Sequence, residues 1–293
     1  MKILLTGATG FLGSHLLRSL IENNHEVVVL KRSTSDCWRI EDLIGSTIAY
    51  NLDEYSVEKI FAIERPSVII HTACLYGKKG ESKEDLEEVN VNFGLDLLSV
   101  GLKNGLHTFI NTDTLLPAEI NDYTKSKSKF REHLFSFSPG LQVVNFRIEF
   151  MYGPYDGKDK FLPWLMHQII HTKNDIPLTS GEQKRDFIYI DDVVSAYISV
   201  LEKMDALELH NKADLTSGRL MKLKEFILIV AREIAETKKN DAVGRLKFGS
   251  IPNRKGETIN LDLDGTMIQK IGWNPKVNFE TGIKKLIEKD FKE

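Results

Sequence analysis

Residues 3–16 read Ile-Leu-Leu-Thr-Gly-Ala-Thr-Gly-Phe-Leu-Gly-Ser-His-Leu, an apolar run that leads into glycines spaced three apart. This run and a second one at 26–30 predict strands, and the amphipathic segment between them predicts a helix. Gly7 allows a tight turn, Gly10 lets an anion approach bare backbone, and Gly13 lets the helix pack closely on the strand. Because a helix N-terminus favours a pyrophosphate, this context predicts a dinucleotide-binding turn. The expected contacts come from Gly7, Thr9, Gly10, Phe11, Leu12 and Gly13.

The residues that close the second strand predict which dinucleotide is bound. An acidic side chain there would hold the ribose 2′-hydroxyl of NAD, whereas basic side chains would accept the 2′-phosphate of NADP. The sequence has Lys31, Arg32 and Ser33 at this point. We therefore expect NADP, and NAD is the alternative if the two cations only face solvent.

Apolar runs alternate with helical segments through the first half of the chain. Strands are expected at 46–51, 66–73 and 108–111, with helices at 57–64 and 86–103 between them. Alternation of this kind favours right-handed crossovers, so it predicts an α/β protein with a doubly wound parallel sheet. Ligands bind at the carboxyl ends of such strands. Further cofactor contacts are accordingly expected from Asn51, Leu52, Thr72 and Ala73.

Hydroxyl groups follow the strand expected at 108–111. Thr112 and Thr114 come directly after it, and Tyr123 precedes Lys127 by four residues. On a helix this spacing places the phenol and the ammonium group on one face. A neighbouring cation lowers the pKa of a phenol, so Tyr123 could exchange a proton near neutral pH. The pattern predicts an acid–base site with Tyr123, Lys127 and one of the two threonines as catalytic residues.

The composition argues against several other functions. The formal net charge of the 293 residues is −3 and the lysine pairs are scattered, so no nucleic-acid-binding surface is expected. No apolar run approaches the roughly 20 residues of a membrane-spanning helix. The two cysteines suggest neither a disulfide framework nor a metal site, and the eight histidines show no metal spacing. We expect a cytoplasmic protein without a metal, a membrane partner or a nucleic-acid partner.

These stretches together resemble the extended short-chain dehydrogenase/reductase family, which includes the NAD-dependent epimerases and dehydratases and acts on nucleotide-linked sugars. The resemblance covers nearly the whole chain. In the first half it rests on 6–13, 71–73 and the Tyr123/Lys127 pair. In the second half it rests on Arg147 before the Tyr-Gly-Pro at 152–154, the Arg-Asp-Phe-Ile-Tyr-Ile-Asp-Asp at 185–192, and the Ile-Gly-Trp-Asn-Pro at 271–275. Within the family the chain is most similar to the CDP-abequose and CDP-paratose synthases, on 109–114, 152–161 and 179–192.

The resemblance implies that the chain forms two domains with different binding roles. A Rossmann-like NAD(P)-binding domain is expected over 1–150 and about 185–205. A smaller C-terminal α/β cap that binds the nucleotide sugar is expected over 151–184 and 206–293. A homodimer is expected through the helices at 86–103 and 122–137.

The implied reaction is NADPH-dependent reduction of the 4-keto group of a nucleotide-linked 6-deoxy or 3,6-dideoxy hexose. The closest resemblance favours CDP as the nucleotide, with a role in deoxysugar, O-antigen or other polysaccharide biosynthesis. Tyr123 would protonate the sugar oxygen and Thr114 would hydrogen-bond to it, with Thr112 as the alternative register. The 4,6-dehydratases of the family have Asp-Glu after the catalytic threonine. Here Leu115 and Leu116 follow Thr114, and Asp113 and Thr114 follow Thr112, so neither register supplies the glutamate and dehydration is disfavoured.

Substrate contacts are implied at Phe150, Phe161, Arg185 and Arg254. The guanidinium fork suits phosphate, although either arginine could instead form a structural ion pair. Phe150 stands where many relatives carry an asparagine. Two other functions remain open. An NAD-dependent epimerase would use the same Tyr–Lys pair, and a non-catalytic NADP-sensing protein would not need it.

Overall fold

The computed structural model describes residues 1–137, 140–239, 242–253 and 263–292, and the chain divides into two units. The first unit comprises Met1–Ile148, Val194–Leu215 and Asp264–Trp273. The second comprises Glu149–Val193, Thr216–Leu263 and Asn274–Glu293.

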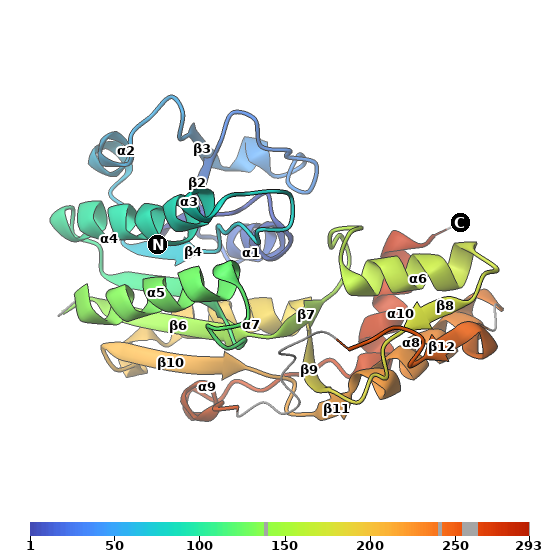
Figure 1. The fold of residues 1–293 in the computed structure, drawn as a ribbon. Coiled ribbons are helices and arrows are strands. Elements are labelled where there is room, and N and C mark those ends of the chain that lie inside the picture. Colours follow the sequence, from blue (N-terminus) through green and yellow to red (C-terminus); the bar gives the residue numbers. More distant parts are fainter. Residues whose placement is uncertain (138–139, 240–241, 254–262, 293) are drawn as a thin grey trace. The chain divides into compact units, whose positions relative to one another are not determined.

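Within the described residues, the first unit contains a seven-stranded sheet in the order β10-β6-β5-β4-β1-β2-β3 (Figure 1). The strands are β1 (Lys2–Thr6), β2 (Glu26–Lys31), β3 (Ile48–Asn51), β4 (Val68–His71), β5 (Thr108–Thr114), β6 (Gln142–Ile148) and β10 (His210–Leu215). All neighbouring strands pair in parallel. The predicted doubly wound parallel sheet is confirmed. Its strand order reverses between β1 and β4, the place where ligands bind in such sheets.

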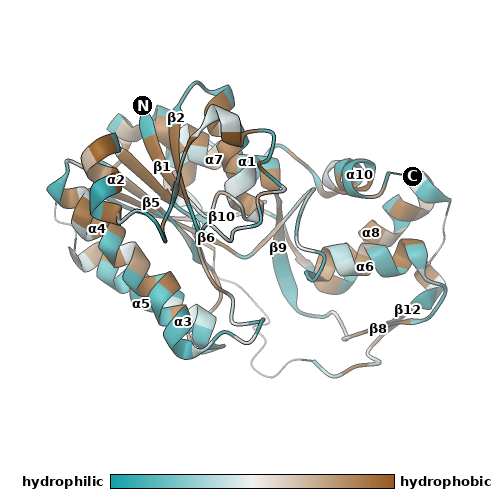
Figure 2. Ribbon diagram, turned by 90° about the horizontal axis from the view of Figure 1, so that it is seen from above, coloured by the Kyte–Doolittle hydropathy of each residue, from teal (hydrophilic) through white to brown (hydrophobic). Residues whose placement is uncertain are grey.

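Helices cover both faces of this sheet. They are α1 (Phe11–Glu22), α2 (Val57–Glu64), α3 (Lys83–Glu87), α4 (Phe93–Lys103), α5 (Asp122–Phe137), α7 (Ile190–Glu202) and α9 (Thr266–Lys270), with short helical turns η1 (Ile44–Ser46), η2 (Glu88–Asn92) and η3 (Met204–Ala206). Figures 1 and 2 show α2, α4 and α5 on one face and α1 on the other. The strands between them are strongly apolar (Figure 2), as expected for parallel strands buried on both faces.

Two local predictions differ from the structure. The helix expected at 86–103 is interrupted by a wider π-helical turn, η2, between α3 and α4. Strand β5 continues through Thr114 rather than ending at Asn111, because β6 remains paired with it as far as Ile148. Thr112 and Thr114 are therefore strand residues and not loop residues.

The second unit has small sheets of its own. Strands β7 (Phe150–Tyr152), β9 (Lys184–Tyr189) and β11 (Leu220–Lys222) form one, and β8 (Ile176–Leu178) pairs with β12 (Leu246–Phe248). The helices are α6 (Phe161–His171), α8 (Leu223–Lys238) and α10 (Phe279–Asp290), with the turn η4 (Val243–Arg245). The rings of Phe187 and Phe226 stack in its core at 3.7 Å.

The unit boundaries differ from those expected. Residues 185–193 belong to the second unit, because β9 pairs with β7 and β11. Residues 206–215 belong to the first, because β10 pairs with β6. Residues 264–273 also belong to the first, since the amide of Asp264 donates to Asp214 Oδ2 (2.7 Å) and the amide of Asp214 donates to Asp264 O (3.0 Å). Across the described part of the chain, no helix combines the length and apolar character needed to cross a membrane.

Candidate active site

The glycine turn after β1 has a geometry that other residues could not adopt. Gly7 has a φ of +72°, and a Cβ there would lie 2.5 Å from Thr72 Oγ1. A Cβ at Gly13 would lie 2.0 Å from the carbonyl oxygen of Gly7. Within the described residues, no side chain caps the N-terminus of α1 and its first turn carries no acidic residue. The N–H groups and the positive end of the helix dipole therefore fit the pyrophosphate of a dinucleotide.

Thr6 forms hydrogen bonds with the residues that follow β4, beside this turn. Its hydroxyl accepts hydrogen bonds from the amides of Thr72 (3.2 Å) and Ala73 (3.3 Å), and the Thr72 hydroxyl donates to the Thr6 carbonyl (2.8 Å). The predicted cofactor residues Thr72 and Ala73 thus adjoin Gly7 where the strand order reverses.

The residues predicted to select the cofactor lie at the ends of β2 and β3. Lys31 Nζ donates to Asn51 Oδ1 (2.7 Å), and the Leu52 amide donates to the Lys31 carbonyl (2.8 Å). Arg32 is exposed. The Ser33 amide donates to Asp53 Oδ1 (2.8 Å), and hydrogen bonds from Ser33 lower the pKa of the Asp53 carboxyl.

A third cation near the turn was not identified from the sequence. The Arg39 guanidinium donates to the carbonyl of Thr9 (3.3 Å) and lies 4.4 Å from the centre of the Trp38 ring. No motif or spacing signals it, because Thr9 and Arg39 are 30 residues apart.

Thr114 and Tyr123 form the core of the predicted acid–base site. Thr114 is the last residue of β5 and Tyr123 lies in the first turn of α5. The two side chains hydrogen-bond to each other, and the Thr114 hydroxyl also accepts from the Leu116 amide (3.2 Å). Tyr76 adds an aromatic ring, with its centre 5.0 Å from that of Tyr123.

Thr112 has a different partner. Its hydroxyl lies 2.7 Å from the hydroxyl of Tyr197, a fully buried residue of α7. The structure therefore brings Thr114, rather than Thr112, together with Tyr123.

Burial controls the protonation of the Tyr123 phenol. It raises the pKa of Tyr123 well above its usual value, Cys74 and Asp113 add to this rise, and the hydrogen bond with Thr114 opposes it. The Tyr123/Lys127 spacing predicts a lowered pKa for the phenol, and this prediction is wrong because loss of solvent dominates. The phenol is protonated at neutral pH and can act as a proton donor.

Lys127 is buried one turn after Tyr123, with 3% of its surface exposed. Burial and the nearby Lys127 charge lower the pKa of His71 to about 3, so His71 is neutral. The Nδ1 atom of His71 lies 2.8 Å from Thr6 Oγ1, and its ring packs against Phe130. The His71 side chain therefore adds no charge to the sheet beneath the helix that carries Tyr123 and Lys127.

The π-helical turn η2 positions another residue that sequence analysis missed. Asn90 is fully buried, accepts from the Leu75 amide (2.8 Å) and donates to the Leu75 carbonyl (2.9 Å) and to Ser126 Oγ (2.9 Å). Asn90 thereby links the segment after β4, through Leu75, to the helix of Tyr123, through Ser126. The widened turn is a recognised feature of functional sites, but it leaves no clear pattern in sequence.

The predicted substrate residues that the structure describes belong to the second unit. Phe150 is in β7, with its ring 4.9 Å from that of Phe187, and Phe161 begins α6. Arg185 Nε lies 3.2 Å from Glu149 Oε1. Arg254 lies outside the described residues.

Glu149 is a second functional candidate that the sequence did not suggest. Its side chain is 3% exposed and its Oε2 accepts from the Asp186 amide (3.0 Å). Burial raises the pKa of Glu149 to about 7, although the Asp186 amide and the Arg185 charge act in the opposite direction. Among the described residues, no group of three or more histidine, cysteine or acidic side chains could hold a metal ion.

Comparisons with known proteins agree with this geometry. The model of the NAD dependent epimerase/dehydratase family matches residues 3–212. A CDP-abequose synthase of Salmonella muenchen is 30% identical over 296 residues, and one of Salmonella typhimurium is 28% identical over 300 residues. Each alignment covers 98% of this chain and 97% of the relative. Among solved structures, the UDP-glucose 4-epimerase of Thermotoga maritima, determined with UDP-glucose, has a TM-score of 0.82 at 26% identity and 98% coverage of both chains.

Proposed function

This chain belongs to the NAD dependent epimerase/dehydratase family, and from that premise we propose that it is an NADPH-dependent 4-ketoreductase of nucleotide sugars. The proposed substrate is a CDP-linked 4-keto hexose of the 6-deoxy or 3,6-dideoxy type. The names of the two Salmonella relatives support this choice. The product would serve deoxysugar and polysaccharide biosynthesis in the cytoplasm.

The protonated phenol of Tyr123 beside Thr114 is the observation that carries the proposal. Reduction of a ketone requires a proton donor at the carbonyl oxygen, and the Tyr123 phenol beside the Thr114 hydroxyl can supply that proton. A dehydratase would in addition need acidic groups after the catalytic hydroxyl, where this chain has Leu115 and Leu116.

In the proposed reaction, bound NADPH supplies a hydride to C4 of the sugar. Tyr123 donates its proton to the C4 oxygen, so that the ketone becomes a secondary alcohol. Thr114 hydrogen-bonds to the same oxygen while negative charge develops on it. Lys127 would hold the nicotinamide ribose, and solvent returns a proton to Tyr123.

The choice of NADPH rests on the basic side chains at the end of β2. Lys31 and Arg32 would accept the 2′-phosphate, and Ser33 would donate a hydrogen bond to it. The pyrophosphate would lie on the N-terminus of α1, between the glycine turn and Thr72. In the second unit, Arg185 would bind a phosphate of the nucleotide sugar.

An epimerase is the second candidate, favoured by the likeness to the Thermotoga maritima enzyme. Its first half-reaction would require Tyr123 to remove a proton, and Lys31 and Arg32 at the end of β2 count against the NAD that it would use. An epimerase of this type would also retain its NAD through purification.

Oxidation of NADPH by CDP-, dTDP-, GDP- and UDP-linked 4-keto-6-deoxy sugars tests the proposal, with NADH and Tyr123→Phe alongside. We expect turnover with a CDP sugar and a loss of at least about a hundredfold in Tyr123→Phe. Absence of oxidation with every sugar, together with NAD retained by the purified protein, would contradict the proposal and favour the epimerase.

A further inference from the structure

An ion pair between a buried carboxylate and a partly buried guanidinium joins the strand of Thr114 to the helix of Tyr123. Asp113 precedes Thr114 in β5, and its side chain is fully buried. Its Oδ2 lies 2.7 Å from Nη1 of Arg131, which follows Tyr123 by two turns on α5. The proposed reaction requires no ionic group at this position, so the pair calls for another explanation.

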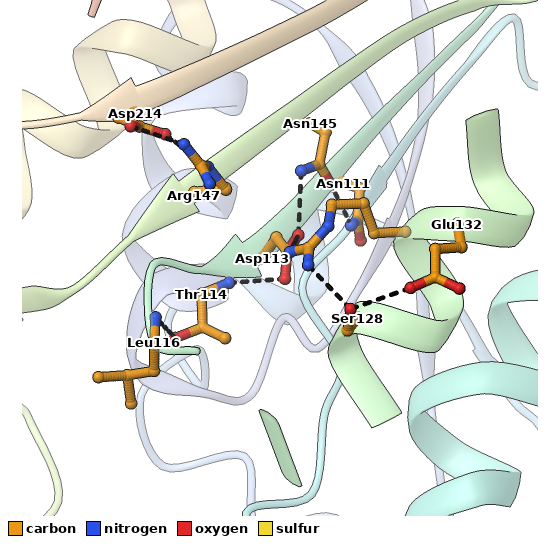
Figure 3. A network of polar contacts seen from close by, with 10 residues as sticks. Asn111, Asp113, Thr114, Leu116, Ser128, Glu132, Asn145, Arg147 and Asp214 are labelled. Carbon is orange, nitrogen blue, oxygen red and sulfur yellow. Dashed lines mark hydrogen bonds and ion pairs between the residues drawn. The ribbon is translucent and has the colours of Figure 1, made fainter. Parts of the chain in front are cut away.

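The hydrogen bonds that the structure gives the Asp113 carboxylate come from β5, β6 and α5 (Figure 3). The Thr114 amide donates to Oδ1 (2.7 Å), and Asn145 of β6 donates to Oδ2 (3.0 Å). Asn145 in turn accepts from Asn111 (2.6 Å). The carboxylate therefore joins its own strand, the neighbouring strand and α5 at one point.

The second branch of the Arg131 fork acts within α5. Its Nη2 donates to Ser128 Oγ (3.0 Å), the residue next to Lys127. One guanidinium thus links α5 to β5 through Asp113 and is itself held in place by Ser128 of its own helix. The planar guanidinium thus donates in two directions, to Asp113 on β5 and to Ser128 on α5, which a lysine ammonium cannot do with the same fixed geometry.

An ion pair is an unusual means of joining a strand to a helix at a buried position. Removing two charges from water is costly, and apolar side chains often provide equal or better stability. The pair also acts on the phenol, because the Asp113 charge raises the pKa of Tyr123. The other groups that face Tyr123 are Cys74 and Tyr76 from the segment after β4, Thr114 from β5, and Lys127 on its own helix.

We infer that Asp113 and Arg131 are positioning residues that hold the Tyr123 phenol within hydrogen-bonding reach of Thr114. This inference relies on the proposed function for the roles of Tyr123 and Thr114. The pair does not contact substrate or cofactor in this scheme. It maintains the alignment of donor and hydroxyl on which the rate depends, since small displacements of reacting groups reduce rates strongly.

Arg131→Met tests the inference, with Lys129→Met as the matched control. Lys129 lies on the same helix but pairs with Glu87 of α3 near the surface. With the sugar that is reduced fastest, we expect kcat of Arg131→Met to fall about tenfold while the KM values change less than about twofold. Arg131→Lys keeps the charge but loses the fork, so its kcat should fall about threefold. The control should retain the wild-type kcat.

Amide hydrogen exchange provides a readout that does not depend on turnover. In Arg131→Met the amides of the first two turns of α5 should exchange faster, whereas in Lys129→Met they should not. If the wild-type protein reduces no sugar, the proposed function fails. The hydrogen-exchange comparison alone then tests the role of Asp113 and Arg131. Equal exchange in both variants, or equal kcat in both, would overturn the inference. Should Arg131→Met fail to fold, the same comparisons are made with Arg131→Lys.

Discussion

Tyr123 and Glu149 are acids whose protonation depends on burial more than on their charged neighbours. Burial raises the pKa of both groups, even though Tyr123 has Lys127 one turn away and Glu149 faces Arg185. For Tyr123, the consequence is a phenol that remains a proton donor across the neutral range. For Glu149, it is a carboxyl that titrates near neutral pH.

Glu149 makes stability depend on pH. Because its folded-state pKa of about 7 exceeds the usual 4.5, its favourable contribution is complete below about pH 4.5 and is lost as the pH rises through 7. The free energy of unfolding should therefore decrease by up to about 3 kcal/mol between about pH 5 and pH 8. Glu149→Gln should flatten this part of the profile. Urea unfolding at both pH values measures the effect, and parallel profiles for the two proteins would contradict it.

Arg32 and Lys31 should contribute unequally to cofactor preference. Lys31 already donates to Asn51, whereas Arg32 is exposed at the end of β2. Arg32→Ala should lower the ratio of kcat/KM for NADPH over NADH about tenfold, because a charge-assisted contact with the 2′-phosphate is lost. Lys31→Ala should lower it about twofold. If neither variant changes the ratio, these residues do not read a 2′-phosphate.

At the scale of the elements, the turn from β1 into α1 leaves no room for a side chain at Gly13. A Cβ at Gly13 would lie 2.0 Å from a backbone oxygen that cannot move without displacing the turn. Gly13→Ala should therefore cost about 3 kcal/mol of stability and weaken NADPH binding. Thermal unfolding measures the loss of stability, and the change in NADPH fluorescence on binding measures the loss of affinity.

Gly45→Ala is the control for that substitution. Gly45 lies in η1, and no described atom is within 4 Å of a Cβ placed there. Its stability should stay within about 0.5 kcal/mol of the wild type. A Gly13→Ala protein as stable as Gly45→Ala would mean that the turn can relax.

For the molecule as a whole, the family resemblance predicts a homodimer. The helices α4 and α5 lie side by side on one face of the sheet (Figure 1), and two such pairs can meet across a twofold axis. Light scattering should yield twice the mass of one chain over a range of protein concentrations. The mass of a single chain at every concentration would contradict the prediction.

The sequence by itself determined the first unit's fold and the family. Glycine spacing and apolar periodicity act through neighbouring residues, so Gly7, Gly13 and the runs of β1, β2 and β4 predict their own structure. The Tyr123/Lys127 spacing likewise placed both side chains on one turn of α5. The boundaries of the units were less predictable, because β9 and β10 are assigned by their pairing partners and not by their own composition.

Three features depended on the tertiary structure. They are the contact between Tyr123 and one of the two threonines, the residues that connect α5 to β5, and the raised pKa values of Tyr123 and Glu149. The family pattern favoured Thr114 and left Thr112 as the alternative, and in the structure Tyr197 from a distant helix engages Thr112 while Thr114 lies with Tyr123. Asp113 and Arg131, 18 residues apart, carry no shared motif. These outcomes depend on burial and on contacts between distant segments, because the cost of removing a charged or polar group from water is set by what folds around it.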